Sequence, residues 1–237
     1  MELRKENLQD LSLLVRKAGF PEELLSDLGK KIMEGKEPSF SLPYATTIEG
    51  HAVKGELYFK EEYRKGDLKW EEFTMQVPKE SKPLIAENKF LVGQGYDTTL
   101  REAYNLLHGR FVYREPTFDP GRNYWLRLDF GKEGSGYLRL NFWESTFKVE
   151  QGLAGSPLNF YLKPAAKKEL LDALRQGDRK ELDLSVSGVA KKIWAEASPV
   201  LKKIRLSDAR DETIELPAFN KDVQLEVKRQ PSKGRRH

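Results

Sequence analysis

The amino-acid sequence predicts an α+β fold, in which an N-terminal helical hairpin precedes a central, mostly antiparallel sheet with one helix and a C-terminal α/β portion. Two changes of hydrophobic period predict this class. Apolar residues recur at helical spacing over residues 3–32, and from about Ile48 the period becomes two, as in strands with one buried face. Helix-like and strand-like patterns alternate again after Pro164. The 237 residues can bury the core of one large domain or of two small ones.

Residues 1–37 are expected to form the helical hairpin. Gly19 ends the first apolar run, and Pro21 stands where the first turn of a second helix favours proline. The second helical pattern continues to Gly35, a residue type that commonly follows the last turn of a helix. The segment 37–43, which is flanked by prolines, is expected to link this hairpin to the rest of the chain.

Residues 38–163 are expected to form an antiparallel β-rich core with one helix. The strands expected in its first half lie at 51–60, 68–77 and 90–92. Thr99 and Glu102 have the spacing of a capping box, which marks the start of a helix. Apolar residues then recur at helical spacing until Gly109, so one helix is expected between the strands.

Residues 124–142 carry the clearest strand pattern, two alternating runs around a Gly-rich turn, and predict a β-hairpin. One face would pack on a core with Leu126, Leu128, Phe130, Leu138, Leu140 and Phe142. The other face would carry Trp125, Arg127, Asp129, Tyr137, Arg139 and Asn141. An exposed sheet face with aromatic rings and guanidinium groups is a known platform for nucleic-acid bases and phosphates.

Two alternative registers of this hairpin pair different side chains on the second face. In one register Arg127 faces Arg139, a like-charge pair that disfavours folding unless an anion lies between the two groups. In the other register Asp129 faces Arg139 and Trp125 faces Trp143. We favour the second register, because opposite charges and paired rings each contribute about 0.2–1 kcal/mol without any ligand.

Residues 164–217 are expected to form the C-terminal α/β portion, and residues 218–237 a basic tail. The elements expected there are a helix at 164–176, a strand at 182–186, a short helix at 189–197 and strands at 200–206 and 213–216. The second strand of the 124–142 hairpin is expected to continue to Val149. We expect all parts to form one compact assembly, and the alternative is two subdomains divided near residues 150–163.

Composition and motifs exclude several classes of site. The chain has no cysteine, which excludes disulfides, thiolate nucleophiles and cysteine-based metal sites. The three histidines, His51, His108 and His237, have no metal-ligand spacing. The sequence contains no G-x-S-x-G motif and no phosphate-binding loop that opens a helix. We therefore predict no catalytic residue, no metal and no cofactor.

The N-terminal segment is charged where a signal peptide needs an apolar core, and no run approaches the roughly 18 apolar residues of a membrane span. These features predict a cytoplasmic protein without a membrane partner. Lys and Arg total 41 against 37 Asp and Glu, a formal charge of +4, which permits an anionic partner.

Aromatic and basic residues also interleave over residues 110–114, and three lysine doublets occur in the C-terminal region, at 167–168, 191–192 and 202–203. The candidate phosphate contacts are Arg110, Arg114, Arg122, Arg127 and Arg139, the candidate base-stacking residues are Trp125 and Tyr137, and the tail would add Lys228, Arg229, Arg235 and Arg236. Such a set predicts a salt-dependent attraction to DNA or RNA.

Five segments of the chain resemble a family of uncharacterised proteins from Bacteroidetes that are often encoded on plasmids and conjugative elements. These segments are EAYNLLHGR at 102–110, YWLRLDF at 124–130, KELLDALRQG at 168–177, WAEASP at 194–199 and IRLSD at 204–208. The similarity covers roughly residues 5–212 and lies mainly in the order of the segments. The usual Ala-Asn-Pro of the family is Ala-Ser-Pro in this chain. The resemblance implies a DNA-associated or mobile-element accessory role and brings no catalytic signature.

The sequence therefore predicts a non-enzymatic, bacterial, nucleic-acid-associated accessory protein of a mobile genetic element. The alternative is a protein-interaction module that regulates or inhibits a conjugation or defence enzyme, through the outer faces of the N-terminal helices or an open sheet edge. A third hypothesis is an enzyme with an unrecognised site, which would show Glu, His or Tyr side chains converging in a deep pocket.

Overall fold

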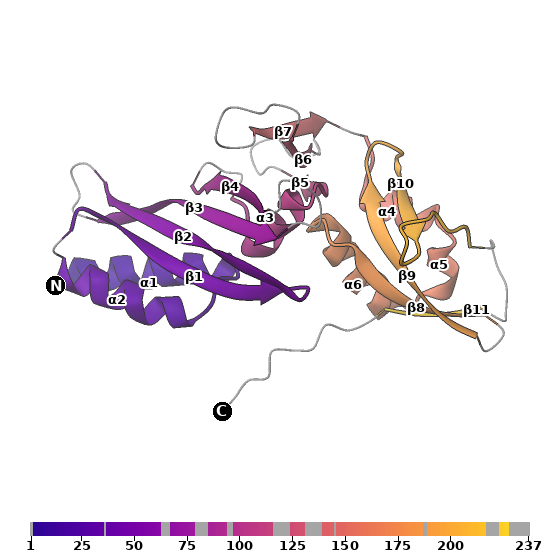
Figure 1. Ribbon diagram of the computed structural model, residues 1–237, viewed down its shortest axis with the longest axis horizontal. Helices are drawn as coiled ribbons and strands as arrows, with labels where there is room; N and C mark the ends of the chain where they lie inside the picture. Colours follow the sequence, from indigo (N-terminus) through magenta and orange to yellow (C-terminus); the bar gives the residue numbers. More distant parts are fainter. Residues whose placement is uncertain are drawn as a thin grey trace. The chain divides into compact units, whose positions relative to one another are not determined.

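The computed structural model describes the chain except residues 1, 36, 63–66, 79–84, 94–96, 116–123, 131–138, 145, 187–188, 217–222 and 228–237. The described part is α+β, as the sequence predicts (Figure 1). The chain divides into two compact units, unit 1 with Met1–Gly109 and Leu128–Asn141, and unit 2 with Arg110–Arg127 and Phe142–His237.

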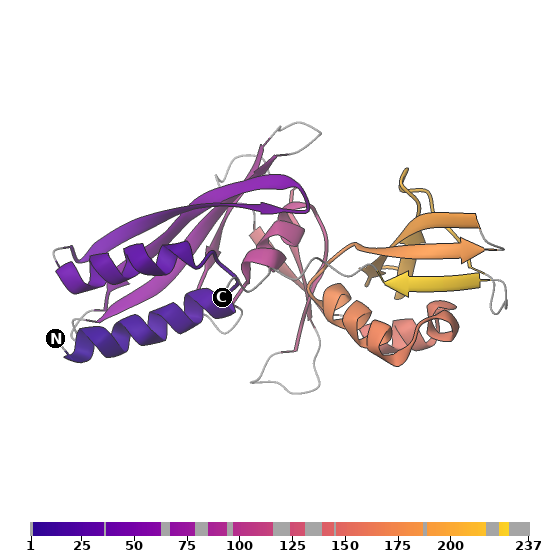
Figure 2. The same ribbon diagram turned by 90° about the horizontal axis from the view of Figure 1, so that it is seen from below.

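Unit 1 begins with the expected helical hairpin, α1 (Glu2–Lys17) and α2 (Glu23–Glu34). The buried side chains of the two helices are Leu11, Val15, Leu24, Leu28 and Ile32, whereas Leu13 and Leu14 are exposed. Gly35 ends α2 in the left-handed conformation with a φ of 57°, and its N–H donates to the carbonyl of Lys31 at 3.2 Å. Both helices lie along one face of a four-stranded sheet (Figure 2).

This sheet is antiparallel, in the order β1-β2-β3-β4. Its strands are β1 (Ser39–Ile48), β2 (His51–Glu61), β3 (Leu68–Pro78) and β4 (Ile85–Leu91). The expected linker at 37–43 is therefore wrong, because β1 begins within it. Pro43 is compatible with β1 because this strand is at the edge of the sheet, where a missing N–H leaves no ladder bond unmade.

Phe20, in the turn between α1 and α2, fixes the helical hairpin to the sheet. Its ring makes edge contacts with Tyr44, Trp70 and Phe73, with centroid distances of 5.0, 5.5 and 5.1 Å. All four side chains are buried. Such edge-to-face pairs add to the free energy gained by burying apolar surface.

The predicted central helix is α3 (Leu100–Leu107), and its capping box is confirmed. The hydroxyl of Thr99 accepts from the N–H of Glu102 at 3.3 Å, and the Glu102 carboxylate accepts from the N–H of Thr99 at 2.8 Å. The N–H of Leu100 donates to the carbonyl of Ala18 at 2.8 Å, which joins the start of α3 to the end of α1. Gly109, with a φ of 75°, follows the helix as predicted.

The strands of the predicted 124–142 hairpin are β6 (Tyr124–Asp129) and β7 (Arg139–Glu144), and β6 also pairs with β5 (Val112–Arg114). Each of β6 and β7 contributes residues to both units. The side chains of β7 and the turn at 131–138 lie outside the described residues, so the choice between the two registers stays a prediction.

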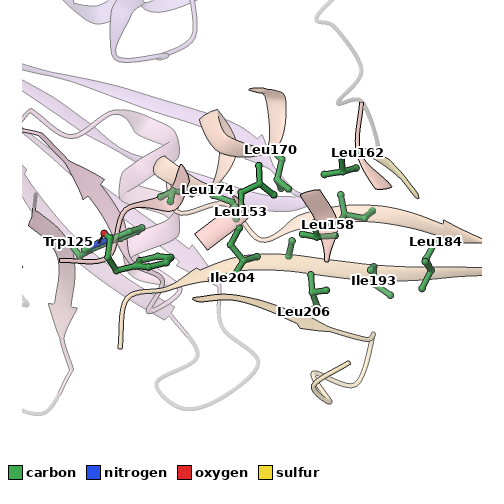
Figure 3. Close-up of a cluster of buried hydrophobic side chains, with 14 residues drawn as sticks. Trp125, Leu153, Leu158, Leu162, Leu170, Leu174, Leu184, Ile193, Ile204 and Leu206 are labelled. Carbon is green, nitrogen blue, oxygen red and sulfur yellow. Dashed lines mark hydrogen bonds between the residues drawn. The ribbon is translucent and has the colours of Figure 1, made fainter. Parts of the chain in front are cut away.

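Unit 2 packs three helices on one face of a second four-stranded sheet, which has the order β10-β9-β8-β11 (Figure 2). Its elements are α4 (Val149–Ala154), α5 (Leu158–Tyr161), α6 (Pro164–Arg175), β8 (Lys180–Val186), β9 (Val189–Ser198), β10 (Lys203–Ser207) and β11 (Val223–Val227). Figure 3 shows the core between the layers, where Leu170 and Leu174 of α6 face the same cluster as Ile193 of β9.

Four predictions for this half are wrong. The expected strand at 213–216 is absent from these described residues, and Thr213 makes only an isolated bridge to Ser207. The expected helix at 189–197 is strand β9, whose alternate residues Ile193 and Ala195 are fully buried against the helices. The expected basic tail contains β11, which pairs with β8. The expected extension of the 124–142 hairpin to Val149 ends at Glu144, and α4 begins at Val149.

Candidate nucleic-acid interface

Three of the predicted arginines, Arg110, Arg114 and Arg127, belong to unit 2 and are described by the structure. Arg127 is exposed, and its guanidinium carbon lies 5.2 Å from the centroid of the Phe111 ring. Arg110 and Arg114 are half-buried, and Arg114 donates to the carbonyl of Tyr113 at 3.1 Å. Arg127 is thus the member of this trio that offers an exposed cation on an aromatic ring.

The expectation that Trp125 stacks on nucleic-acid bases is wrong, because its side chain is 0 % exposed. Its indole N–H donates to the carbonyl of Phe147 at 3.3 Å, and its ring stacks on the Phe147 ring with centroids 5.7 Å apart. Tyr113 contacts the indole edge-on, with ring centroids 5.2 Å apart. Leu126, on the opposite face of β6, is buried as well, so this strand has no solvent face at that point.

The remaining predicted contacts lie outside the described residues or their described side chains. They are Arg122, Tyr137, Arg139, Lys228, Arg229, Arg235 and Arg236. Their roles stay predictions.

A basic feature that the sequence shows only as a lysine doublet is the turn between β9 and β10. Ser198 pairs with Lys203, and residues 199–202 form the connecting turn. Val200 and Leu201 are 51 % and 57 % exposed at its tip. Lys202 has a φ of 53°, a left-handed conformation that costs a residue with a side chain about 1–2 kcal/mol.

Local hydrogen bonds hold this turn in its conformation. The N–H of Lys202 donates to the carbonyl of Pro199 at 3.3 Å, and the N–H of Leu201 reaches the hydroxyl of Ser198 at 3.4 Å. Pro199 is buried and has a fixed φ of its own. The strained Lys202 backbone is therefore stabilised by the surrounding turn, a situation that recurs at functional sites.

A cavity of about 270 Å³ lies at the base of the turn. Its lining residues are Thr146, Phe147, Gln151, Gly152, Gly155, Lys202 and Lys203. Among these described residues two are lysines and none is acidic. A Cβ on Gly152 would lie 2.6 Å from the Phe147 ring, so only glycine lets the ring pack this closely against α4. The cavity thus combines an aromatic wall with two ammonium groups.

Two other hollows on the described surface carry carboxylates. The cavity of about 250 Å³ along β10 shares Lys203 with the first cavity and also includes Arg205 and Glu215. Arg205 is paired with Glu196 at 2.9 Å and with Asp211 at 2.8 Å. The hollow of about 680 Å³ on the unit 1 sheet includes Glu56 and Glu87. Neither charge pattern favours an anionic ligand as the lysine-lined cavity does.

Unit 1 holds a polar cluster that sequence reasoning missed. The Tyr104 hydroxyl lies 2.6 Å from Nδ1 of His51 and 3.3 Å from a carboxylate oxygen of Glu49, which forms an ion pair with Arg101. The rings of His51 and His108 stack with centroids 5.5 Å apart. Spacing along the chain gives no signal for this group, since the β1–β2 turn and α3 meet only in the fold.

The cluster fastens the β1–β2 turn to α3. Glu49 and Gly50 both have positive φ, 51° and 83°, and a glutamate is an unusual choice for such a hairpin turn. Tyr104 is fully buried, and its hydroxyl is already engaged by His51 and Glu49. Among the described residues no three or more His, Asp and Glu side chains form a group that could hold a metal ion.

Comparison with protein-family models, curated proteins and solved structures finds no match to this chain. In the part of the chain that the structure describes, no helix is both long and apolar enough to cross a membrane. Function must therefore be argued from the site itself, that is, from the charge, exposure and geometry of named side chains.

Proposed function

We propose that this protein is a non-enzymatic, nucleic-acid-associated accessory protein that contacts phosphates with the turn between β9 and β10. The observation that carries the proposal is the cavity of about 270 Å³ lined by Lys202 and Lys203 with no acidic residue among its described lining. A phosphate placed there would lie beside two lysines, and no acidic residue belongs to the described lining.

The state of the two lysines supports this role. Among the described residues neither Lys202 nor Lys203 forms an ion pair, and both are exposed. An unpaired lysine needs to break no salt bridge in order to bind a phosphate, and each phosphate that it neutralises releases counterions condensed on the DNA. Phosphate contacts of this kind supply most of the affinity for nucleic acid without regard to sequence.

Arg127 supplies a further cation in the same unit. Its guanidinium group is exposed and lies over the Phe111 ring. This contact orients the side chain and restricts its rotamers. An oriented guanidinium loses less conformational entropy when it binds a phosphate. The predicted contact by Arg127 is therefore retained in this proposal, whereas base stacking by Trp125 is not.

The role in a mobile genetic element rests on the sequence resemblance described above. The resemblance covers the segments 194–199 and 204–208, which flank the basic turn. An accessory protein of a plasmid or conjugative element would act on DNA with little sequence preference, and a phosphate-binding turn suits that task.

Fluorescence anisotropy with labelled single-stranded DNA, duplex DNA and RNA at low salt tests the proposal. The double variant K202A/K203A should raise the Kd for every bound ligand on the order of 10-fold, which corresponds to about 1.4 kcal/mol. The loss should be similar for different base sequences, because the lysines contact phosphates.

A matched control removes the same charge from another lysine doublet. Lys30 and Lys31 on α2 are paired with Asp27 at 3.0 Å and Glu37 at 3.1 Å. K30A/K31A should leave the Kd unchanged. Absence of binding by the wild-type protein at micromolar concentration, or equal losses in the two double variants, would contradict the proposal.

A protein partner is the second candidate, and one observation favours it. β4 is an edge strand of the unit 1 sheet, and Leu91 at its end is 54 % exposed. An open edge with an apolar side chain can accept an added strand from another protein, such as a conjugation or defence enzyme. A pull-down that recovers one protein in stoichiometric amount and no nucleic acid would support this function over the first. The Leu91→Lys variant should not recover that protein.

A further inference from the structure

The tip of the turn between β9 and β10 pairs two adjacent exposed apolar side chains with two adjacent lysines. Val200 and Leu201 are more than half exposed, whereas the apolar residues of the strands on either side, Ile193 and Ile204 among them, belong to the buried core (Figure 3). Phosphate binding by Lys202 and Lys203 does not require apolar side chains at the tip. The exposure of Val200 and Leu201 therefore needs a separate explanation.

The tip of the turn between β9 and β10 is narrow, and local hydrogen bonds fix its conformation. β9 and β10 form an antiparallel ribbon up to the pair Ser198 and Lys203, and residues 199–202 close it. The bonds to Pro199 and Ser198 described above fix the turn, so Val200 and Leu201 project from a preformed edge. A preformed edge loses little conformational entropy on insertion between other groups.

Duplex DNA offers a matching ligand. Proteins that bend DNA insert apolar side chains between base steps and hold the adjacent phosphates with Lys or Arg, and a two-stranded ribbon is narrow enough to enter a groove. The cost of unstacking the bases is offset by the extra surface that the bent duplex brings into contact.

We propose, on the basis of the function proposed above, that the preferred ligand is duplex DNA and that Val200 and Leu201 form a wedge that enters a base step. Lys202 and Lys203 hold a phosphate next to that step, in the cavity at the base of the turn. Binding therefore bends the duplex.

An anionic membrane is the other surface that attracts apolar and basic side chains together. The cavity favours DNA over a membrane, because a recess of about 270 Å³ with two ammonium groups suits one discrete phosphate. A lipid surface would instead be met by a broad basic face. Vesicles that contain anionic phosphatidylserine provide the corresponding arm of the test.

The test uses a duplex of about 25 base pairs with a donor and an acceptor dye at its two ends, so that bending raises energy transfer. Wild-type protein should bind and raise the transfer efficiency. V200S/L201S should bind with an unchanged salt dependence and leave the duplex straight, whereas K202A/K203A should weaken binding. L13S/L14S, which changes two adjacent exposed leucines of α1, is the control and should bend the duplex as the wild type does.

Each outcome separates the wedge from the function on which it rests. Binding by the wild type without a change in energy transfer overturns the wedge and leaves phosphate binding intact. Equal bending by V200S/L201S and wild type also overturns the wedge. Failure to bind any nucleic acid overturns both proposals, as does binding to the anionic vesicles alone. Circular dichroism confirms that each variant is folded before these comparisons.

Discussion

The hydroxyl of Tyr104 lies 2.6 Å from Nδ1 of His51, and this contact joins α3 to the start of β2 in unit 1. The single phenolic proton is donated to the Glu49 carboxylate, so a neutral imidazole protonated on Nδ1 donates to the hydroxyl oxygen. The same hydroxyl oxygen is 3.3 Å from the Glu49 carboxylate, so one buried group connects the strained β1–β2 turn to the helix.

Tyr104→Phe removes this hydroxyl and keeps the ring in place. The substitution should lower the free energy of unfolding by about 1–2 kcal/mol, because Glu49 loses a hydrogen-bond donor and His51 loses an acceptor in a partly buried site. Urea denaturation measures the change. Tyr58→Phe on β2 is the control, and we expect its effect to be less than about 0.5 kcal/mol. Equal losses in the two variants would show that the bond from Tyr104 contributes nothing specific.

Gly55→Ala should be among the costly single substitutions in unit 1. Gly55 pairs with Tyr44 across β1 and β2, and a Cβ at this position would lie 2.0 Å from the carbonyl oxygen of Thr74. The same oxygen accepts the Tyr44 hydroxyl at 2.9 Å. The clash involves backbone that cannot move aside, so we expect a loss of about 3 kcal/mol or more in thermal or urea unfolding.

Gly50→Ala provides the comparison for that clash. Gly50 has open space around its Cα but a φ of 83°, so alanine there is strained without any collision. The loss should be about 1–2 kcal/mol, smaller than that of Gly55→Ala. The reverse order of the two losses would contradict this account of the β2 packing.

The phenol of Tyr113 should lose its proton at a higher pH than an ordinary tyrosine. Burial, the largest cause, and the carboxylates of Glu115 and Glu150 together raise the pKa of its phenol to about 12, and Arg175 acts in the opposite direction. A tyrosine whose pKa is higher in the folded state than its unfolded value of about 10 contributes stability below pH 10, and this contribution is lost as the pH rises through 12.

Ultraviolet difference absorbance between wild type and Tyr113→Phe isolates this phenol. The difference should show a neutral phenol at pH 10 and the phenolate only as the pH approaches 12. Unfolding free energy of the wild type should also fall more steeply than that of Tyr113→Phe over this range. Titration of Tyr113 near pH 10 in the folded protein would contradict the stated burial.

Local signals allowed much of the fold to be predicted from the sequence. The capping box of Thr99 and Glu102, the stop at Gly109 and the helix ending before Gly35 depend on neighbouring residues, and the structure has all three. Strand β9 is different. Its Ala, Lys and Glu residues have good helix propensity, yet pairing with β8 and β10 places Ile193 and Ala195 in the core and overrides that preference.

The candidate site was harder to predict because its meaning depends on the fold. Alternation in β6 put Trp125 on a solvent face, but the helices and strands of unit 2 cover that face. The doublet of Lys202 and Lys203 was visible in the sequence. Two features distinguish this doublet from the others, namely the strained turn and the cavity without described acidic residues. Both follow from the packing of β10 beside α4.

The salt dependence of duplex binding tests the central claim most directly. Anisotropy titrations between about 50 and 200 mM salt give the slope of log K against log salt, which counts the phosphates neutralised. We predict that K202A/K203A reduces the magnitude of this slope by about 1 for each lysine, whereas K30A/K31A leaves it unchanged. Identical slopes for wild type and K202A/K203A would contradict the assignment of phosphate binding to the turn between β9 and β10.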